Sequence, residues 1–162
     1  MLGKSHVIVS EAFLLPLATN PKYSFALHTV TTSNVLWFMG GIALGALLPD
    51  IDQPESILGR FNPFAKAMKH RTITHTIWAA FLVTWLCCYF GNQEPIWYGL
   101  ALGYWMHLIE DFFSRESIPW LYPFIKKHFH RWGYVTGSWF EKIVVTLASL
   151  FLLWKIIWLL LF

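Results

Sequence analysis

The chain has 162 residues, of which 56% are hydrophobic and 13% are charged, and its formal net charge is +3. Soluble domains average about 45–50% apolar and about 25% charged residues, so this composition excludes a disordered chain and argues against a soluble globule. The small net charge gives no case for nucleic-acid binding, and the adjacent Cys87 and Cys88 exclude a disulfide framework. We therefore expect a small integral membrane protein that forms one domain, residues 1–162.

Stretches without charged residues locate the expected helices in chain order. We predict an all-α, multi-pass transmembrane helical bundle with four spans, near residues 33–49, 74–91, 95–112 and 142–162. Before these spans, residues 6–18 are apolar and follow Lys4, a pattern shared by signal peptides and by short helices. Because Glu11 and Pro16 interrupt this stretch and no clean cleavage motif follows it, we favour a retained, partly embedded amino-terminal helix over a cleaved signal.

The positions of lysine and arginine predict how the spans are oriented. In this topology the segments 50–73 and 113–141 lie on the same side of the membrane, and together they hold eight basic residues. The opposite side has Lys22 and the segment 91–95, which has no lysine or arginine. Because segments rich in lysine and arginine stay in the cytoplasm, we expect 50–73 and 113–141 to be cytoplasmic.

Two carboxylates directly follow the first expected span, where Asp50 and Asp52 flank Ile51. An acidic group at the C-terminus of a helix opposes the helix dipole, so capping alone does not explain this placement. Carboxylate oxygens one residue apart can be presented to a single cation. We therefore treat Asp50 and Asp52 as candidate metal ligands, and the alternative is a polar turn that ends the helix.

His70 and His75 stand at the start of the next expected span. Neutral imidazole is a common ligand of transition metals, and both side chains can reach one site if His70 precedes the helix and His75 lies on its first turn. Arg71, between them, is suited to bidentate bonding of a phosphate oxygen. The alternative is an interfacial cluster in which these groups contact lipid headgroups.

A third group of polar residues closes the 95–112 span. His107 and Asp111 are four residues apart and share one face of a helix, which is a good two-ligand spacing for a divalent metal. Glu110 lies on another face, and we interpret it as a carboxylate at the rim of the site. The alternative is a His–Asp ion pair that closes the end of the helix, although ionisable groups beside an apolar span usually serve a function.

The predicted topology places all three groups on the cytoplasmic side. A retained amino-terminal helix adds His6 to the same face. Glu141, at the start of the last span, is a further candidate ligand, or an ordinary acid facing the positive end of the helix. His128 and His130 lie in a basic, aromatic segment that we interpret as a solvated interfacial loop rather than as a source of ligands.

These segments resemble the signatures of the YdjM-like family, which is described as inner-membrane, metal-dependent hydrolases, some of them under LexA control. The order and the spacing match over most of the chain, and an early histidine such as His6 and a late acid such as Glu141 also fit. The matching segments are Gly45-Ala46-Leu47-Leu48-Pro49-Asp50-Ile51-Asp52, His70-Arg71-Thr72-Ile73-Thr74-His75 and Gly103-Tyr104-Trp105-Met106-His107-Leu108-Ile109-Glu110-Asp111.

The family is in turn distantly similar to zinc-dependent phospholipase C and P1 nuclease, helical enzymes that hydrolyse phosphoesters with three zinc ions. The resemblance implies two or three divalent ions here, zinc in the first place and manganese as the alternative. It implies that the main ions are held by four positions, namely Asp50 or Asp52, His70 or His75, His107 and Asp111. It also implies that His6 joins Asp111 on a neighbouring ion. The distant group has a histidine where this chain has Gly137, so a third ion depends on His128 or His130.

Together these implications predict a metal-dependent phosphoester hydrolase of the bacterial inner membrane, with its site at the cytoplasmic edge. The expected partners are membrane lipids, with a phospholipid or a polyprenyl phosphate as the substrate class, and the sequence gives no oligomeric state. Asp52 or Asp50 would accept a proton, and Arg71 would hold a phosphate oxygen. The alternatives are a membrane protein with a purely structural metal site and a small ion or metal transporter, although the apolar middles of the helices argue against a transport path.

Overall fold

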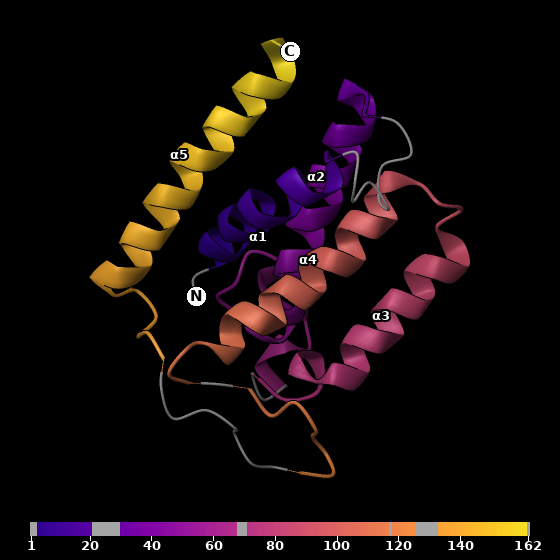
Figure 1. The fold of residues 1–162 in the computed structure, drawn as a ribbon. Helices are drawn as coiled ribbons and strands as arrows, with labels where there is room; N and C mark the ends of the chain where they lie inside the picture. Colours follow the sequence, from indigo (N-terminus) through magenta and orange to yellow (C-terminus); the bar gives the residue numbers. More distant parts are fainter. Residues whose placement is uncertain (1–2, 21–29, 68–70, 117, 126–132, 162) are drawn as a thin grey trace.

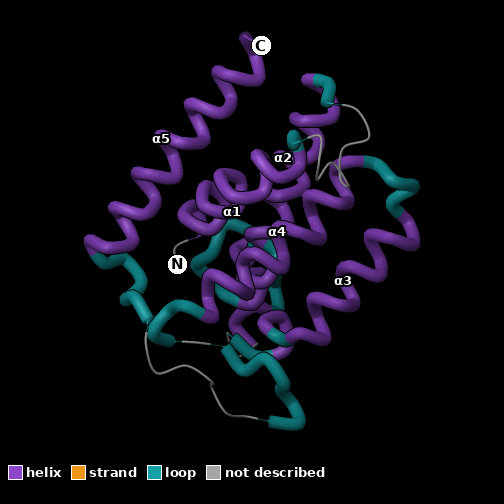
Figure 2. Tube along the Cα trace, in the orientation of Figure 1, coloured by secondary structure: helices purple, strands orange, loops and turns teal. Residues whose placement is uncertain are grey.

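The computed structural model describes residues 3–20, 30–67, 71–116, 118–125 and 133–161, and these ranges contain helices and loops but no strand (Figures 1 and 2). The α-helices lie close to the ranges expected from the charge-free stretches, and the all-helical class is confirmed. They are α1 (Gly3–Ala18), α2 (Thr32–Leu47), α3 (Ile77–Phe90), α4 (Pro95–Phe112) and α5 (Trp139–Leu161). Short 3-10 helices lie between α2 and α3, namely η1 (Pro49–Asp52), η2 (Gly59–Phe61), η3 (Ala65–Ala67) and η4 (Ile73–His75).

Two of the four expected spans are long and apolar enough to cross a bilayer. They are the segment Thr32–Asp52, which contains α2 and η1, and the 23-residue helix α5. Helix α3 is apolar but has only 14 residues, and the 18 residues of α4 include polar side chains near its end, whereas a span needs about 20 apolar residues. Length and composition alone therefore identify two candidate spans rather than four.

The centre of the fold is the crossing of α2 and α4, whose backbones are in direct contact. The contact is made by glycines spaced four residues apart on each helix, Gly41 and Gly45 on α2 and Gly99 and Gly103 on α4. A Cβ atom on Gly45 would lie 2.1 Å from the carbonyl oxygen of Leu100, which leaves no room for any side chain. Small residues at this spacing let two helices approach closely, as they do in membrane proteins.

Helices α3 and α5 lie on opposite sides of this central pair (Figure 1). Helix α1 packs between α5 and α2, and Leu15 of α1 is fully buried next to Leu152 of α5. Outward-facing residues of α5 such as Trp154 and Leu160 are exposed, as are many on α3. Apolar outer surfaces of this extent are typical of helices that face lipid.

The loops at one end of the bundle are fixed to α4 by hydrogen bonds. The hydroxyl group of Tyr104 donates to the carbonyl oxygen of Thr74, which holds η4 against α4. Thr76 caps α3, because its Oγ1 accepts a hydrogen bond from the backbone N–H of Ala79 at 3.2 Å. The end of α2, the start of α3 and the end of α4 therefore meet, as the topology predicts.

We predict that Gly45→Ala destabilises the protein and that Gly40→Ala does not. A methyl group at Gly45 forces the helices apart, at a cost of about 1–3 kcal/mol. A methyl group at Gly40 meets no atom within 4 Å, and alanine is favoured over glycine in a helix by up to about 1 kcal/mol. Thermal unfolding of the two variants in the same detergent measures the difference, and equal shifts in Tm would contradict the prediction.

Candidate metal centre

Three imidazoles and two carboxylates are buried together where α1, η1, η4 and α4 meet. His6, His75 and His107 are 0% exposed, and Asp50 and Asp111 are also buried. Their ligand atoms form two overlapping sets, in each of which all atoms lie within 4.8 Å of one another. We call Asp50, His75 and His107 the first group, and His6, His107 and Asp111 the second group.

The first group has the spacing of a tetrahedral metal site. Nε2 of His107 lies 3.3 Å from Nε2 of His75, and Oδ1 of Asp50 lies 3.5 Å from His75 Nε2 and 3.6 Å from His107 Nε2. Bonds of about 2.0–2.2 Å to a tetrahedral zinc ion place ligand atoms about 3.3–3.6 Å apart. Oδ2 of Asp111 lies slightly farther away, at 3.8 and 3.9 Å from the two nitrogens, so the three atoms of the first group leave a fourth position open.

The second group adds His6 from α1 to this arrangement. Its ring stacks on His107 with 3.9 Å between ring centroids, and its Nε2 lies 3.4 Å from Oδ1 of Asp111. His6 Nε2 is buried and makes no hydrogen bond within the described part of the chain, so a cation that displaces its proton can bind there. Because Oδ1 of Asp111 faces His6 and its Oδ2 faces the first group, this carboxylate can bridge two ions.

Each imidazole of the first group is oriented through its Nδ1 atom. Nδ1 of His107 donates to the backbone carbonyl oxygen of Ala46 at 2.6 Å. Nδ1 of His75 lies 3.0 Å from Oγ1 of Thr74, whose hydroxyl group donates to Oδ2 of Asp52 at 2.8 Å. Such partners fix the tautomer and the ring orientation of metal-binding histidines, leaving Nε2 for the ion.

Glu110 has the same function for His6, and the interpretation of this residue as a rim carboxylate is wrong. It is 6% exposed, lies 2.7 Å from His6 Nδ1 and accepts a hydrogen bond from Oγ of Ser10 at 3.0 Å. Burial lowers the pKa of His6, but attraction to Asp111 and Glu110 outweighs it and raises the pKa to about 9. The sequence carried one signal of this contact, because His6 and Ser10 share a face of α1.

Asp52 and Glu141 lie outside the two groups. Asp52 is buried, but its Oδ2 lies 3.8 Å from Nδ1 of His75, on the side of the ring away from Nε2. Glu141 is buried in the first turn of α5, where its Oε2 accepts a hydrogen bond from the backbone N–H of Gly137 at 2.8 Å. Asp52 is therefore placed to support His75, and Glu141 is placed to fix the loop before α5.

His70 of the predicted site lies outside the described residues, as do His128 and His130, on which a third ion depends. Arg71 is described, and its Nη2 lies 3.0 Å from Oδ2 of Asp111. Its backbone φ of 58° is uncommon for a residue other than glycine, and such conformations are often found at functional sites. The structure therefore brings Arg71 next to the second group.

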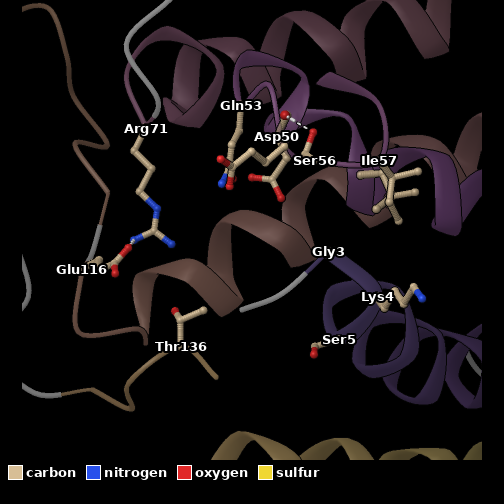
Figure 3. Close-up of a pocket in the computed structure, with 12 residues that line it drawn as sticks. Gly3, Lys4, Ser5, Asp50, Gln53, Ser56, Ile57, Arg71, Glu116 and Thr136 are labelled. Carbon is tan, nitrogen blue, oxygen red and sulfur yellow. Dashed lines mark hydrogen bonds and ion pairs between the residues drawn. The ribbon is translucent and has the colours of Figure 1, made fainter. Parts of the chain in front are cut away.

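A cavity of about 610 Å³ adjoins the centre (Figure 3). Asp50 and Arg71 form part of its wall, together with the amino-terminal residues of α1 and loop residues 53 and 55–57. A candidate ligand thus faces a space large enough for a small molecule. The cavity therefore reaches the edge of the first group at Asp50.

The profile of the YdjM inner membrane protein family matches residues 1–162. The inner membrane protein YdjM of Escherichia coli strain K12 is 34% identical over 92 residues, which cover 49% of this chain and 46% of that protein, and the YdjM protein of Shigella flexneri gives the same values. The chain thus spans about half the length of these relatives. The uncharacterized protein YvsG of Bacillus subtilis strain 168 is 31% identical over 115 residues, covering 66% of this chain and 72% of YvsG. No solved structure matches the chain.

We predict that Glu110→Gln weakens metal binding on the order of 10–100-fold, because a neutral amide holds His6 Nδ1 less firmly and can turn an N–H group toward it. Zinc bound per protein molecule, measured by elemental mass spectrometry after dialysis at fixed free zinc, tests this expectation. Glu94→Gln, at the exposed amino-terminal end of α4, is the matched control and should bind zinc like the wild type. Equal zinc contents in the two variants would contradict the role of Glu110.

Proposed function

We propose that this chain, which belongs to the YdjM inner membrane protein family, is a membrane-bound, metal-dependent hydrolase of phosphoesters. The observation that carries the proposal is the pair of overlapping ligand groups beside a cavity. A divalent metal held by these groups, beside an accessible space and a guanidinium group, would supply the charge stabilisation that favours phosphoester hydrolysis.

The donor atoms fit divalent zinc. The first group offers two nitrogens and one oxygen at tetrahedral spacing and leaves a fourth position for water, and the second group offers His6 and Asp111. Mixed imidazole and carboxylate sets of this kind suit zinc, and manganese is the alternative. When bound there, divalent ions would lower the pKa of a water molecule to near neutrality and polarise the phosphoryl group.

The side chains around the cavity have different proposed roles in the reaction. Asp50 lines the cavity and is placed to accept a proton from the attacking water, whereas Asp52 acts through Thr74 and His75. Asp111 holds the two groups together, and Arg71 can donate hydrogen bonds to a phosphate oxygen. The structure supports Asp50 as the proton acceptor, in place of Asp52, which was the first choice from the sequence.

We infer that α2, α3, α4 and α5 cross the bacterial inner membrane and that α1 is partly embedded at its cytoplasmic side. The apolar outer faces of α3 and α5 support this arrangement, as does the excess of lysine and arginine in the segments that flank the site. A site at the end of the bundle lies at the depth of lipid headgroups. Phospholipids and polyprenyl phosphates are therefore the substrate classes that we propose.

We predict that His107→Ala removes more bound zinc than His6→Ala does, because Nε2 of His107 is within reach of both groups whereas His6 belongs only to the second. Phosphoester hydrolysis should fall at least about 100-fold in both variants, since metal-activated water is lost or misplaced. Zinc analysis combined with a panel of phosphatase and phospholipase substrates tests this, and Glu94→Gln is again the control.

Two results would overturn the proposed function. Equal zinc contents in the wild type, His107→Ala and His6→Ala would show that the ligand assignment is wrong. Full zinc binding by the wild type without hydrolysis of any phosphoester in the panel would favour a structural metal site or a metal transporter.

A further inference from the structure

The cavity beside the metal centre has unpartnered hydrogen-bond donors on one wall. Nε and Nη1 of Arg71 and Oγ1 of Thr136 are buried and make no hydrogen bond with any residue that the structure describes. Both residues line the cavity (Figure 3). A buried donor without an acceptor costs about 1–3 kcal/mol, and more when it is charged. Among the described residues, Arg71 Nε and Thr136 Oγ1 therefore have no acceptor, and Arg71 Nη1 has only its ion pair with Glu116.

Arg71 is held in place by two carboxylates of different character. Its Nη2 lies 3.0 Å from the buried Oδ2 of Asp111, and its Nη1 lies 2.8 Å from Oε2 of Glu116 without hydrogen-bond geometry. The Arg71 side chain is 10% exposed, whereas that of Glu116 is 68% exposed. Asp111 is thus a fixed partner, and Glu116 can move into solvent at little cost.

Thr136 is brought to the same wall by contacts from a distant segment. The backbone N–H of Arg115 donates to the carbonyl oxygen of Tyr134 at 2.9 Å, and the hydroxyl group of Tyr134 donates to the carbonyl oxygen of Glu110 at 3.0 Å. Glu141 holds the following turn through its bond to the N–H of Gly137. These contacts hold Thr136 near the end of α4. Its hydroxyl group makes no hydrogen bond with any residue in the described ranges.

The opposite wall adds positive potential to the cavity. It contains the amino-terminal end of α1, where Gly3, Lys4 and Ser5 line the space. The N-terminus of a 16-residue helix carries a partial positive charge that favours anions. This potential is a secondary contribution, because the unpartnered donors of Arg71 and Thr136 already define the ligand chemistry.

We propose that Arg71 and Thr136 form an oxyanion subsite that binds a tetrahedral phosphate group, and that Glu116 is the carboxylate which the phosphate displaces. A phosphate offers several acceptor oxygens, enough for Nε, Nη1 and Oγ1 at once, and guanidinium groups bind phosphate in bidentate fashion. The subsite deepens the proposed function, on which it rests for the identity of the substrate. Phosphate binding itself requires no hydrolysis.

If phosphate displaces Glu116, removing the charge of this residue should strengthen phosphate binding rather than weaken it. Removing its charge frees Nη1, so Glu116→Gln should bind inorganic phosphate severalfold more tightly than the wild type. Arg71→Ala should weaken binding on the order of tenfold or more, and Thr136→Val about threefold. Isothermal titration of inorganic phosphate into the purified protein, both zinc-loaded and chelator-treated, measures each affinity.

Two matched controls test whether these changes in phosphate affinity are specific to Glu116 and Thr136 rather than common to any loss of a carboxylate or a hydroxyl group. Glu55→Gln removes another exposed carboxylate from the same cavity and should leave the affinity close to that of the wild type. Thr146→Val removes a hydroxyl group that already donates to the carbonyl oxygen of Lys142 on α5, and it should change nothing. An equal gain for Glu55→Gln and Glu116→Gln, or an unchanged affinity for Thr136→Val, would overturn the proposal.

A second arm identifies the source of the phosphate. In nanodiscs that contain phosphatidic acid, a lipid headgroup in the subsite should lower the apparent affinity for inorganic phosphate relative to phosphatidylcholine nanodiscs. Equal affinities in the two lipids assign the subsite to a soluble phosphate ester. If phosphate binding depends on Arg71 and Thr136 but no phosphoester is hydrolysed, the proposed function is refuted and the subsite is supported. If phosphoesters are hydrolysed but phosphate binding does not depend on Arg71, the subsite is refuted and the proposed function is supported.

Discussion

The contact between the backbones of α2 and α4 sets the geometry on which the rest of the structure depends. Glycines on both helices bring the ends of α2 and α4 together, so that the carbonyl oxygen of Ala46 reaches Nδ1 of His107. The chain then turns through η1 and places Asp50 beside the same imidazole. A wider spacing of the two helices would break both contacts, so the packing of apolar helices and the chemistry of the centre have the same origin.

The polar residues at this end of the bundle are buried, and their partners fix their orientations. His6, His75 and His107 each have one nitrogen held by a neighbour and one directed to the centre, and the neighbours come from different elements, α4, η4 and α2. Charged groups in so dry an environment are costly unless they are paired or bind metal. Helix α1 takes part in this arrangement although it is no candidate span, because it supplies both His6 and Ser10.

The sequence predicted the helices and the meeting of three polar segments, because both follow from the spacing of charges and from the alternation of spans. It could not establish Asp50 rather than Asp52 as the proton acceptor, since the choice depends on the 3-10 geometry of η1. It also missed the role of Glu110, which depends on how α1 docks against α4. Thr136 reaches the cavity wall that carries Arg71 and Glu116 through the pairing of residues 114 and 134, for which no local pattern gives a signal.

The bond from His107 to the carbonyl oxygen of Ala46 has a consequence for sequence divergence. Because the acceptor is a main-chain atom, no change of side chain at position 46 can remove it, provided that the new residue is small enough for the buried site. The orientation of this ligand is therefore encoded by helix geometry rather than by a recognisable partner residue. Distant relatives could retain the same histidine orientation after the residues around it have drifted beyond detection by sequence comparison.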